Sequence, residues 1–197
     1  MFVVALVLAA LTGGATCVSA DAIAFYFGQQ LAGTGSAAEA TINRGAIAFV
    51  PWLALDGSKF ETLVMARYAD STATVAFGPL LGSNNNPKSG ATPYFGAEAR
   101  GKVQLWHSRF IFRLVERHTK EALLARFANI GLEAGPPQLL VRLSYQPIQR
   151  NRVVTHRLAL KAVTSYRNAK VGVEIRQNFD GSNRKGALAE VVIPLKR

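Results

Sequence analysis

Two glycine-rich stretches contain the residue types that bind nucleotide phosphates. Residues 33–38 match the dinucleotide pattern G-x-G-x-x-A, and Asp56 follows about where a ribose-binding acid belongs. Residues 96–102 match the first seven positions of a P-loop, but Val103 stands where Ser or Thr must reach the magnesium ion. Neither stretch has the strand–turn–helix context that phosphate binding needs. We therefore predict no nucleotide or nicotinamide binding and no cofactor.

The three histidines, His107, His118 and His156, are the other candidates for acid–base or metal chemistry. His118 and Glu121 are three residues apart and could share a helical face, but no second such pair completes a metal site. His156 has the parity of the apolar residues in its strand, which is typical of a buried histidine. The chain has no Gly-x-Ser-x-Gly nucleophile elbow. We therefore predict no catalytic and no metal site, and lean against an enzyme.

Basic residues are concentrated in the second half of the chain. The formal net charge is +11; residues 1–100 carry five Lys/Arg and six Asp/Glu, whereas residues 101–197 carry eighteen and six. Such a bias indicates an anionic partner. Six basic residues alternate with apolar ones and are predicted to point away from the core as an anion- or partner-binding face: Arg109, Arg113, Arg142, Arg157, Lys161 and Arg176. The alternative is a solvated sheet face whose charges prevent edge aggregation.

Strands must position these basic residues. Between residues 103 and 114 the apolar and basic side chains alternate, which predicts a strand with an aromatic inner face that includes Trp106 and Phe110. Four further alternating runs follow, near residues 141–145, 157–162, 170–176 and 189–195. By parity, Trp106 and Tyr145 belong to the core. Nucleic acid is therefore a less favoured partner, because exposed stacking aromatics are missing.

One helix is expected among these strands. Thr119 has the chemistry of an N-cap, and Leu123, Phe127 and Ile130 recur at helical spacing before Gly131, where a helix would stop. The second half thus reads as strand–helix–four strands. The predicted fold class is α+β and β-rich: antiparallel sheet with one main helix, at about residues 120–130, packed against the C-terminal strands.

The first half is less regular. Strands are predicted at 22–27, 46–55, 60–67 and 72–77, with a short helix at 37–43. Residues 82–90 read as a long exposed loop, Asp56 and Gly57 as a turn, and residues 180–183 as another turn. We expect a single β-rich domain over residues 21–197, with a seam, if any, near residue 100.

The N-terminus is typical of a signal peptide. Residues 1–20 carry no charge, an apolar run spans residues 2–11, and Val18, Ser19 and Ala20 suit signal peptidase cleavage before Asp21. The alternatives are a retained membrane anchor, for which the apolar run is short, and an ordinary buried segment. Cleavage would remove Cys17, the only cysteine.

Together these features predict a non-enzymatic exported protein of the periplasm or extracellular space, with a bacterial envelope favoured. It would bind or scaffold through its basic face, contacting an anionic envelope component or a partner protein, and would touch a membrane only through its N-terminal segment. The alternative is a structural or assembly protein, virion-like, that contacts nucleic acid. An enzyme of unfamiliar type comes third.

Overall fold

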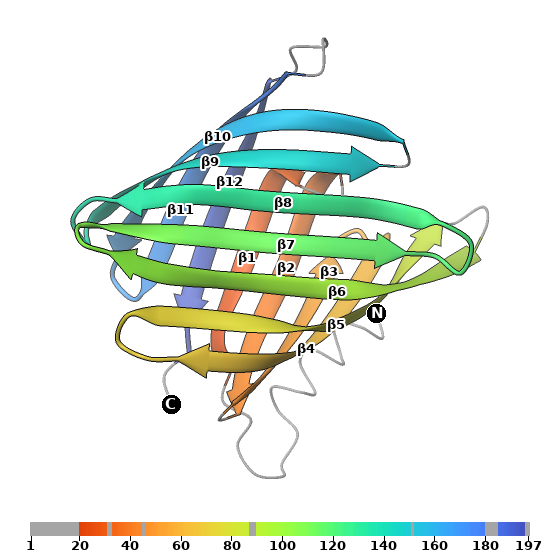
Figure 1. Cartoon of the computed structure of the whole chain (residues 1–197), viewed down its shortest axis with the longest axis horizontal. Coiled ribbons are helices and arrows are strands. Elements are labelled where there is room, and N and C mark those ends of the chain that lie inside the picture. The colour runs from red at the N-terminus through yellow and green to blue at the C-terminus, as the bar shows by residue number, and fades with distance from the viewer. Residues whose placement is uncertain are drawn as a thin grey trace.

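The chain forms a closed antiparallel β-barrel. The computed structural model describes residues 20–30, 33–44, 46–86, 90–150, 152–179 and 185–195. Each of twelve strands pairs with its neighbours in sequence, and β1 pairs with β12 to close the sheet (Figure 1). Closure leaves no strand of this barrel with an unpaired edge. The strand bounds are β1 Ala20–Gln30, β2 Gly33–Arg44, β3 Ile47–Ala54, β4 Lys59–Ala69, β5 Ala73–Asn86, β6 Gly90–Leu105, β7 Ser108–His118, β8 Leu123–Ala134, β9 Leu139–Arg150, β10 Val153–Tyr166, β11 Ala169–Asn178 and β12 Lys185–Pro194.

Antiparallel order places the turns alternately at two ends of the barrel. We call the end where β1 begins and β12 finishes the terminal end, and the opposite end the distal end. At the terminal end, β6–β7 and β10–β11 are joined by two-residue turns, in which Trp106 and Arg167 have φ values of 45° and 51°. Positive φ is what a two-residue hairpin turn requires, because it matches the twist of the flanking strands.

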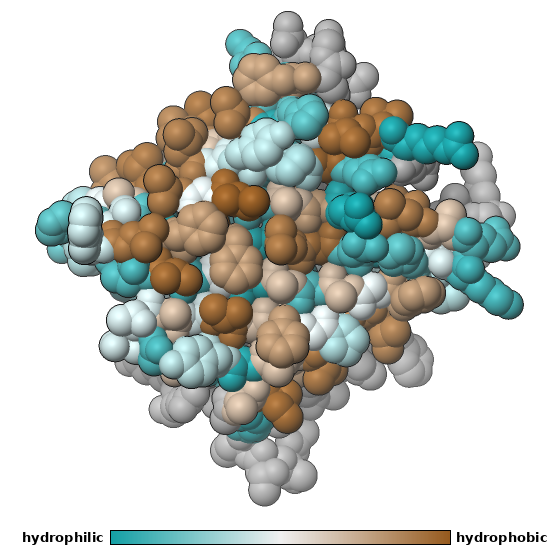
Figure 2. All heavy atoms as spheres, in the orientation of Figure 1, coloured by the Kyte–Doolittle hydropathy of each residue, from teal (hydrophilic) through white to brown (hydrophobic). Residues whose placement is uncertain are grey.

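The two faces of the sheet differ sharply in polarity. On β9, Val141, Leu143 and Tyr145 point outward and are 43%, 58% and 42% exposed, whereas Ser144 and Gln146, which alternate with them, are buried. The same alternation recurs on the other strands of the second half, and hydrophobic side chains cover much of the visible wall (Figure 2). The apolar face of the sheet is therefore the outer face, and the charged face is the inner one.

Part of the barrel interior is filled by apolar side chains. They come from β3 to β9, and Tyr94, Val115, Phe127 and Ile148 belong to the distal halves of their strands. The cluster consists of Ala48, Val50, Leu63, Met65, Ala76, Leu80, Tyr94, Val115, Phe127 and Ile148. Polar and charged side chains occupy much of the rest of the interior, together with a few apolar ones such as Ile111 and Leu188.

The predicted α+β class and its main helix at about 120–130 are wrong. The described residues contain no helix, and residues 123–134 form β8. Thr119 Oγ1 accepts a hydrogen bond from the backbone N–H of Ala122 at 3.2 Å, and Thr119 N–H donates to the Ala122 carbonyl at 2.9 Å. The same side-chain acceptor can cap a helix or close a hairpin turn, and here it closes the β7–β8 turn.

Gly131 has a different role from the expected helix stop. A Cβ on Gly131 would lie 2.5 Å from the Leu143 carbonyl oxygen and 2.7 Å from the Ser144 Cβ. Glycine is thus required because β8 approaches β9 closely at this point.

In the first half, the four predicted strands overlap β1, β3, β4 and β5, whereas the predicted short helix at 37–43 lies in β2 and is wrong. The predicted long loop at 82–90 is largely strand, because β5 extends to Asn86 and β6 begins at Gly90. The turn at Asp56 and Gly57 is confirmed: Asp56 Oδ1 accepts from the backbone N–H of Ser58 at 2.9 Å. The predicted turn at 180–183 and residues 1–19 of the predicted signal peptide lie outside the described residues.

Residues assigned to the core by their apolar parity lie outside the barrel. Trp106 is 97% exposed in the β6–β7 turn, and Tyr145 and His156 lie on the outer face of β9 and β10. Parity determines which side chains share a face of a strand, because successive side chains alternate. It does not determine which of the two faces is turned inward.

Candidate functional site in the barrel interior

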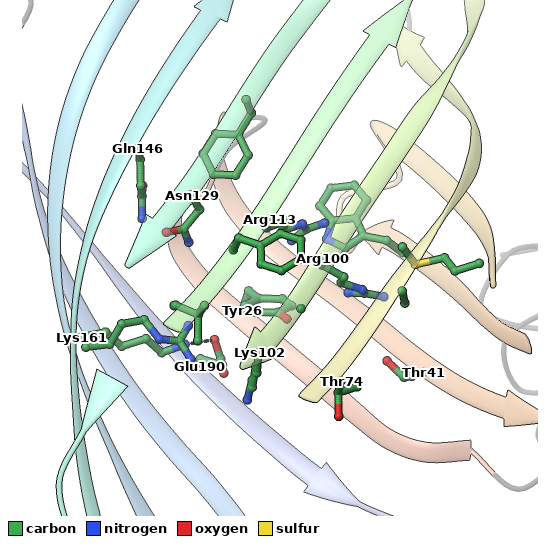
Figure 3. A pocket seen from close by; sticks show the side chains of 18 of the residues that line it. Tyr26, Thr41, Thr74, Arg100, Lys102, Arg113, Asn129, Gln146, Lys161 and Glu190 are labelled. Atoms are coloured by element: carbon green, nitrogen blue, oxygen red, sulfur yellow. Dashed lines mark hydrogen bonds and ion pairs between the residues drawn. The ribbon is translucent and has the colours of Figure 1, made fainter. Parts of the chain in front are cut away.

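The polar side chains of the inner face surround a cavity of about 560 Å³ (Figure 3). Its lining includes only three glutamates, Glu61, Glu174 and Glu190, against eight basic side chains. The basic side chains are Arg67, Arg100, Lys102, Arg113, Arg117, Arg142, Lys161 and Arg176. The cavity lining therefore carries more basic than acidic side chains.

All six basic residues predicted to form an outer face lie on the inner face instead. Arg157, Lys161 and Arg176 are at most 7% exposed, and Arg113, Arg142, Lys161 and Arg176 line the cavity. The expected outward orientation of these six side chains is wrong. Parity correctly grouped them on one face of the sheet, but the barrel closes with that face inside, as it does for the misassigned Tyr145. Their predicted role in binding an anion or partner is a separate matter and stays a prediction.

The strand register arranges five charged residues in one row across the inner face. Arg109, Glu133, Arg142, Lys161 and Glu174 occupy directly opposite positions on the successive strands β7 to β11. Glu133 accepts from Arg142 Nη2 at 2.6 Å and forms an ion pair with Arg109 Nη2 at 3.1 Å. The carboxylate of Glu133 thus pairs with two guanidinium groups.

The other predicted basic residues also have polar partners on the inner face. Arg113 donates to Glu98, with Arg113 Nη2 2.9 Å from Glu98 Oε2, and Arg157 Nε donates to Asn178 Oδ1 at 2.7 Å. Lys161 pairs with Glu190 on β12, and Arg176 pairs with Glu174 on its own strand. These contacts satisfy charges that would otherwise be expensive to bury.

Two ion pairs connect strands that are separated by at least two other strands of the sheet. Arg100 on β6 pairs with Glu39 on β2 at 3.0 Å, and Arg117 on β7 pairs with Glu61 on β4 at 2.8 Å. The Tyr94 hydroxyl also donates to Glu61, at 2.7 Å. These contacts cross the barrel interior and narrow it, because their side chains extend inward from separate parts of the wall.

The sequence analysis missed four of the eight basic residues that line the cavity, namely Arg67, Arg100, Lys102 and Arg117. Arg67 ends a predicted strand, and Lys102 was considered only as part of the rejected P-loop. For Arg67 and Lys102 the available signal was parity, because each alternates with uncharged neighbours on its strand.

None of the histidines lines the cavity, and of the two glycine stretches only residues 96–102 contribute to its lining, through Arg100, Gly101 and Lys102. His118 lies against Glu116 on the outer face of β7, with Nε2 2.6 Å from Oε1, and His156 Nδ1 is 2.5 Å from the Tyr145 hydroxyl. His107 lies in the β6–β7 turn, and the stretches 33–38 and 96–102 lie within β2 and β6. No group of three or more metal-ligating side chains occurs in the part of the chain that the structure describes. The same residues include no helix long and apolar enough to cross a membrane.

No protein family and no curated protein matches the chain. Solved structures do resemble it. The KdgM porin in complex with disordered oligogalacturonate has a TM-score of 0.64 at 13% identity over 89% of this chain and 99% of that one. A second KdgM porin structure has a TM-score of 0.63 at 13% identity over the same shares. A loop-deletion mutant of OmpT, an outer membrane protein of Vibrio cholerae, has a TM-score of 0.51 at 7% identity over 80% of this chain and 62% of that one.

These comparisons correct the functional expectations. The prediction of a periplasmic or secreted binding or scaffold protein is wrong, and so is the virion-like alternative, because the chain forms a closed barrel whose fold resembles that of porins. The same likeness leans against enzymatic activity, as the sequence did. The fold of this chain is similar to that of outer-membrane porins, with a charged interior and an apolar exterior.

Proposed function

We propose that this chain is an outer-membrane barrel that crosses the bilayer with its strands and passes small anionic solutes through its interior. The observation that carries the proposal is the reversed polarity of the sheet, with apolar side chains outside and charged ones inside. Transferring one large hydrophobic side chain out of water is worth about 1.5–3 kcal/mol. A wall of exposed Leu, Val, Ile and Phe side chains is therefore suited to hydrocarbon.

The backbone meets the requirements of a bilayer. In a closed barrel the backbone polar groups pair between strands, which hydrocarbon demands because it offers no alternative partner. The strands range from 8 residues in β3 to 16 residues in β6. A membrane strand needs about 9–11 residues to cross the hydrocarbon core, which lies within this range. Membrane contact would thus involve the whole barrel wall and not an N-terminal segment alone.

Outer-face residues near the two ends suggest where the apolar band stops. Tyr68 and Tyr166 are exposed at the terminal ends of β4 and β10, where an aromatic girdle is typical of membrane barrels. Toward the distal end, Glu116, His118 and Arg126 form an outward charged cluster on β7 and β8. Such charges belong in the headgroup region and not in hydrocarbon.

The predominantly basic lining supports a preference for anions. Charge of one sign inside low-dielectric walls concentrates the opposite ion and speeds its entry. The KdgM porin holds oligogalacturonate, an acidic oligosaccharide. We extend this to acidic oligosaccharides as a solute class for this chain. The six predicted basic residues would then act on a solute mainly through the potential of the cavity, because each already has a carboxylate or, for Arg157, an amide partner.

Fractionation and conductance test this function together. The protein should partition with the outer membrane, require detergent for extraction, and migrate differently on gels before and after boiling. In planar bilayers separating unequal KCl concentrations, the sign of the reversal potential should show anion preference. Recovery in the detergent-free soluble fraction, or a cation-selective pore, would contradict the proposal.

A further inference from the structure

We propose that Arg67, Thr74 and Lys102 form an anion-binding subsite near the terminal end of the barrel interior. The inference rests on the proposed function, because it names the side chains that a permeating anion contacts. The ligand class is a carboxylate or phosphate group. None of the six residues expected from the sequence belongs to this subsite.

The first argument is the pairing of the cavity's basic side chains. Six of the eight are bound to carboxylates: Arg100 to Glu39, Arg113 to Glu98, Arg117 to Glu61, Arg142 to Glu133, Lys161 to Glu190 and Arg176 to Glu174. The side chains of Arg67 and Lys102 form no ion pair and no hydrogen bond with the other described residues. Their donors are therefore available to a solute, whereas each of the other six basic side chains already has a carboxylate partner.

The second argument is the register of three adjacent strands. Thr74 on β5 lies directly opposite Lys102 on β6 and, on its other side, opposite Ala69 on β4. Arg67 is two residues from Ala69 on the same face, so it is the diagonal neighbour of Thr74. Opposite Cβ atoms lie about 4.5–5.5 Å apart and diagonal ones about 7–8 Å or less.

The three side chains thus form a compact group of one guanidinium, one hydroxyl and one ammonium. All three line the cavity, and Lys102 and Thr74 are seen side by side in Figure 3. The Thr74 hydroxyl forms no hydrogen bond with the other described residues. It can therefore donate to an oxygen held between the two cations.

The third argument is the local charge. Lys102 interacts electrostatically with one carboxylate, Glu133, and with three cations, Arg109, Arg142 and Lys170. Glu133 is already bound by Arg109 and Arg142. Asp70 in the β4–β5 turn accepts from the backbone N–H groups of Thr72 and Ala73 and from the Tyr68 hydroxyl. The charged groups that act most strongly on Lys102 are therefore mainly cations.

This group of donors matches an oxyanion. A guanidinium can donate two parallel hydrogen bonds to one carboxylate or phosphate, and an ammonium adds a mobile point charge. A uronic acid residue and a free phosphate ion share this chemistry. The experiment therefore uses both trigalacturonate and inorganic phosphate as probes.

The test compares Arg67→Gln, Lys102→Gln and Thr74→Val with Lys120→Gln, which removes the same charge from the exposed β7–β8 turn. Binding of each probe is measured by calorimetry in detergent micelles, and trigalacturonate block is measured as lost current in planar bilayers. Each of the two lumen charge variants should weaken binding about tenfold or more, and Thr74→Val roughly threefold. Lys102→Arg should retain binding within about threefold, and Lys120→Gln should match wild type.

The outcomes separate this inference from the proposed function. If the wild type conducts anions but Arg67→Gln and Lys102→Gln bind trigalacturonate and phosphate as the wild type does, the subsite is overturned and the channel stands. If the wild type forms no channel, the proposed function fails and calorimetry on the folded barrel still decides the subsite. Absence of binding of both probes to the wild type overturns the subsite.

Discussion

Arg100 on β6 reaches Glu39 on β2 across the barrel interior, with Arg100 Nη1 3.0 Å from Glu39 Oε1. The two residues are 61 positions apart, and Glu39 is only 7% exposed. Arg100 Nε also lies 3.6 Å from Glu98 Oε1, so the guanidinium stands between two carboxylates. This arrangement ties two separate parts of the barrel wall together.

Glu39→Gln should lower the free energy of unfolding by about 1–3 kcal/mol. This loss is smaller than that expected for breaking a fully buried ion pair, because Arg100 still interacts with Glu98 and is partly exposed to solvent. It should also raise single-channel conductance, because a contact that narrows the lumen is lost. Urea titration in detergent and planar-bilayer recording measure the two effects. Glu121→Gln in the exposed β7–β8 turn is the control and should change stability by less than about 0.5 kcal/mol. Wild-type stability and conductance in Glu39→Gln would show that the pair is not a tether.

Leu143→Arg places a charge on the outer face of β9, at a side chain that is 58% exposed. In water such a substitution would be nearly neutral. In a bilayer it should cost about 2–4 kcal/mol near the midplane. The unfolding free energy measured in phosphatidylcholine vesicles, with Gln138→Arg in the β8–β9 turn as control, checks this. Equal stability of the two variants would place this wall outside the hydrocarbon.

Gly82→Ala should disturb Tyr94. A Cβ on Gly82 would lie 2.4 Å from the ring carbon that carries the hydroxyl, whose oxygen donates to Glu61 at 2.7 Å. We expect a loss of about 1–3 kcal/mol from overpacking. In a double-mutant cycle with Tyr94→Ala, most of this loss should disappear, because the ring that causes the clash is gone. An additive cycle would show that the loss does not arise from this contact.

Asp70 should make stability depend on pH in the acid range. Hydrogen bonds from the Tyr68 hydroxyl, and then from Thr72 and Ala73, hold the pKa of this exposed turn carboxyl well below its ordinary value. Because the pKa of Asp70 is depressed in the folded state, the ionised carboxylate contributes to the free energy of unfolding above the unfolded pKa of about 3.9. This contribution is lost as the pH falls from there through the lower folded pKa.

Asp70→Asn should therefore be less stable than wild type at pH 7, and this difference should shrink below about pH 4. Denaturant titrations from pH 7 to pH 2 would measure it. A difference that stays constant over that range would contradict the assignment.

The sequence alone determined which side chains share a face. Alternation of Arg142 with Val141 and Leu143, or of Lys161 with Leu160 and Ala162, is local, because successive side chains of an extended chain point in opposite directions. For the same reason most strands of both halves were predicted. The helix at about 120–130 failed because Leu123, Phe127 and Ile130 fit period 3.6 by spacing alone, and Thr119 can serve a cap or a hairpin turn equally well.

Only the tertiary structure decided which face is inside. In the barrel closed by β1 and β12, Arg142 and Lys161 point into the lumen, and Leu143 and Leu160 point outward. The alternation of side chains along one strand does not determine which face is turned inward. The tertiary structure also determines the ion pairs. Glu39 pairs with Arg100, which is 61 positions away in the sequence, and Glu133 pairs with both Arg109 and Arg142. Among the described residues, Arg67 and Lys102 form no ion pair, and such pairing depends on how separate strands meet around the barrel.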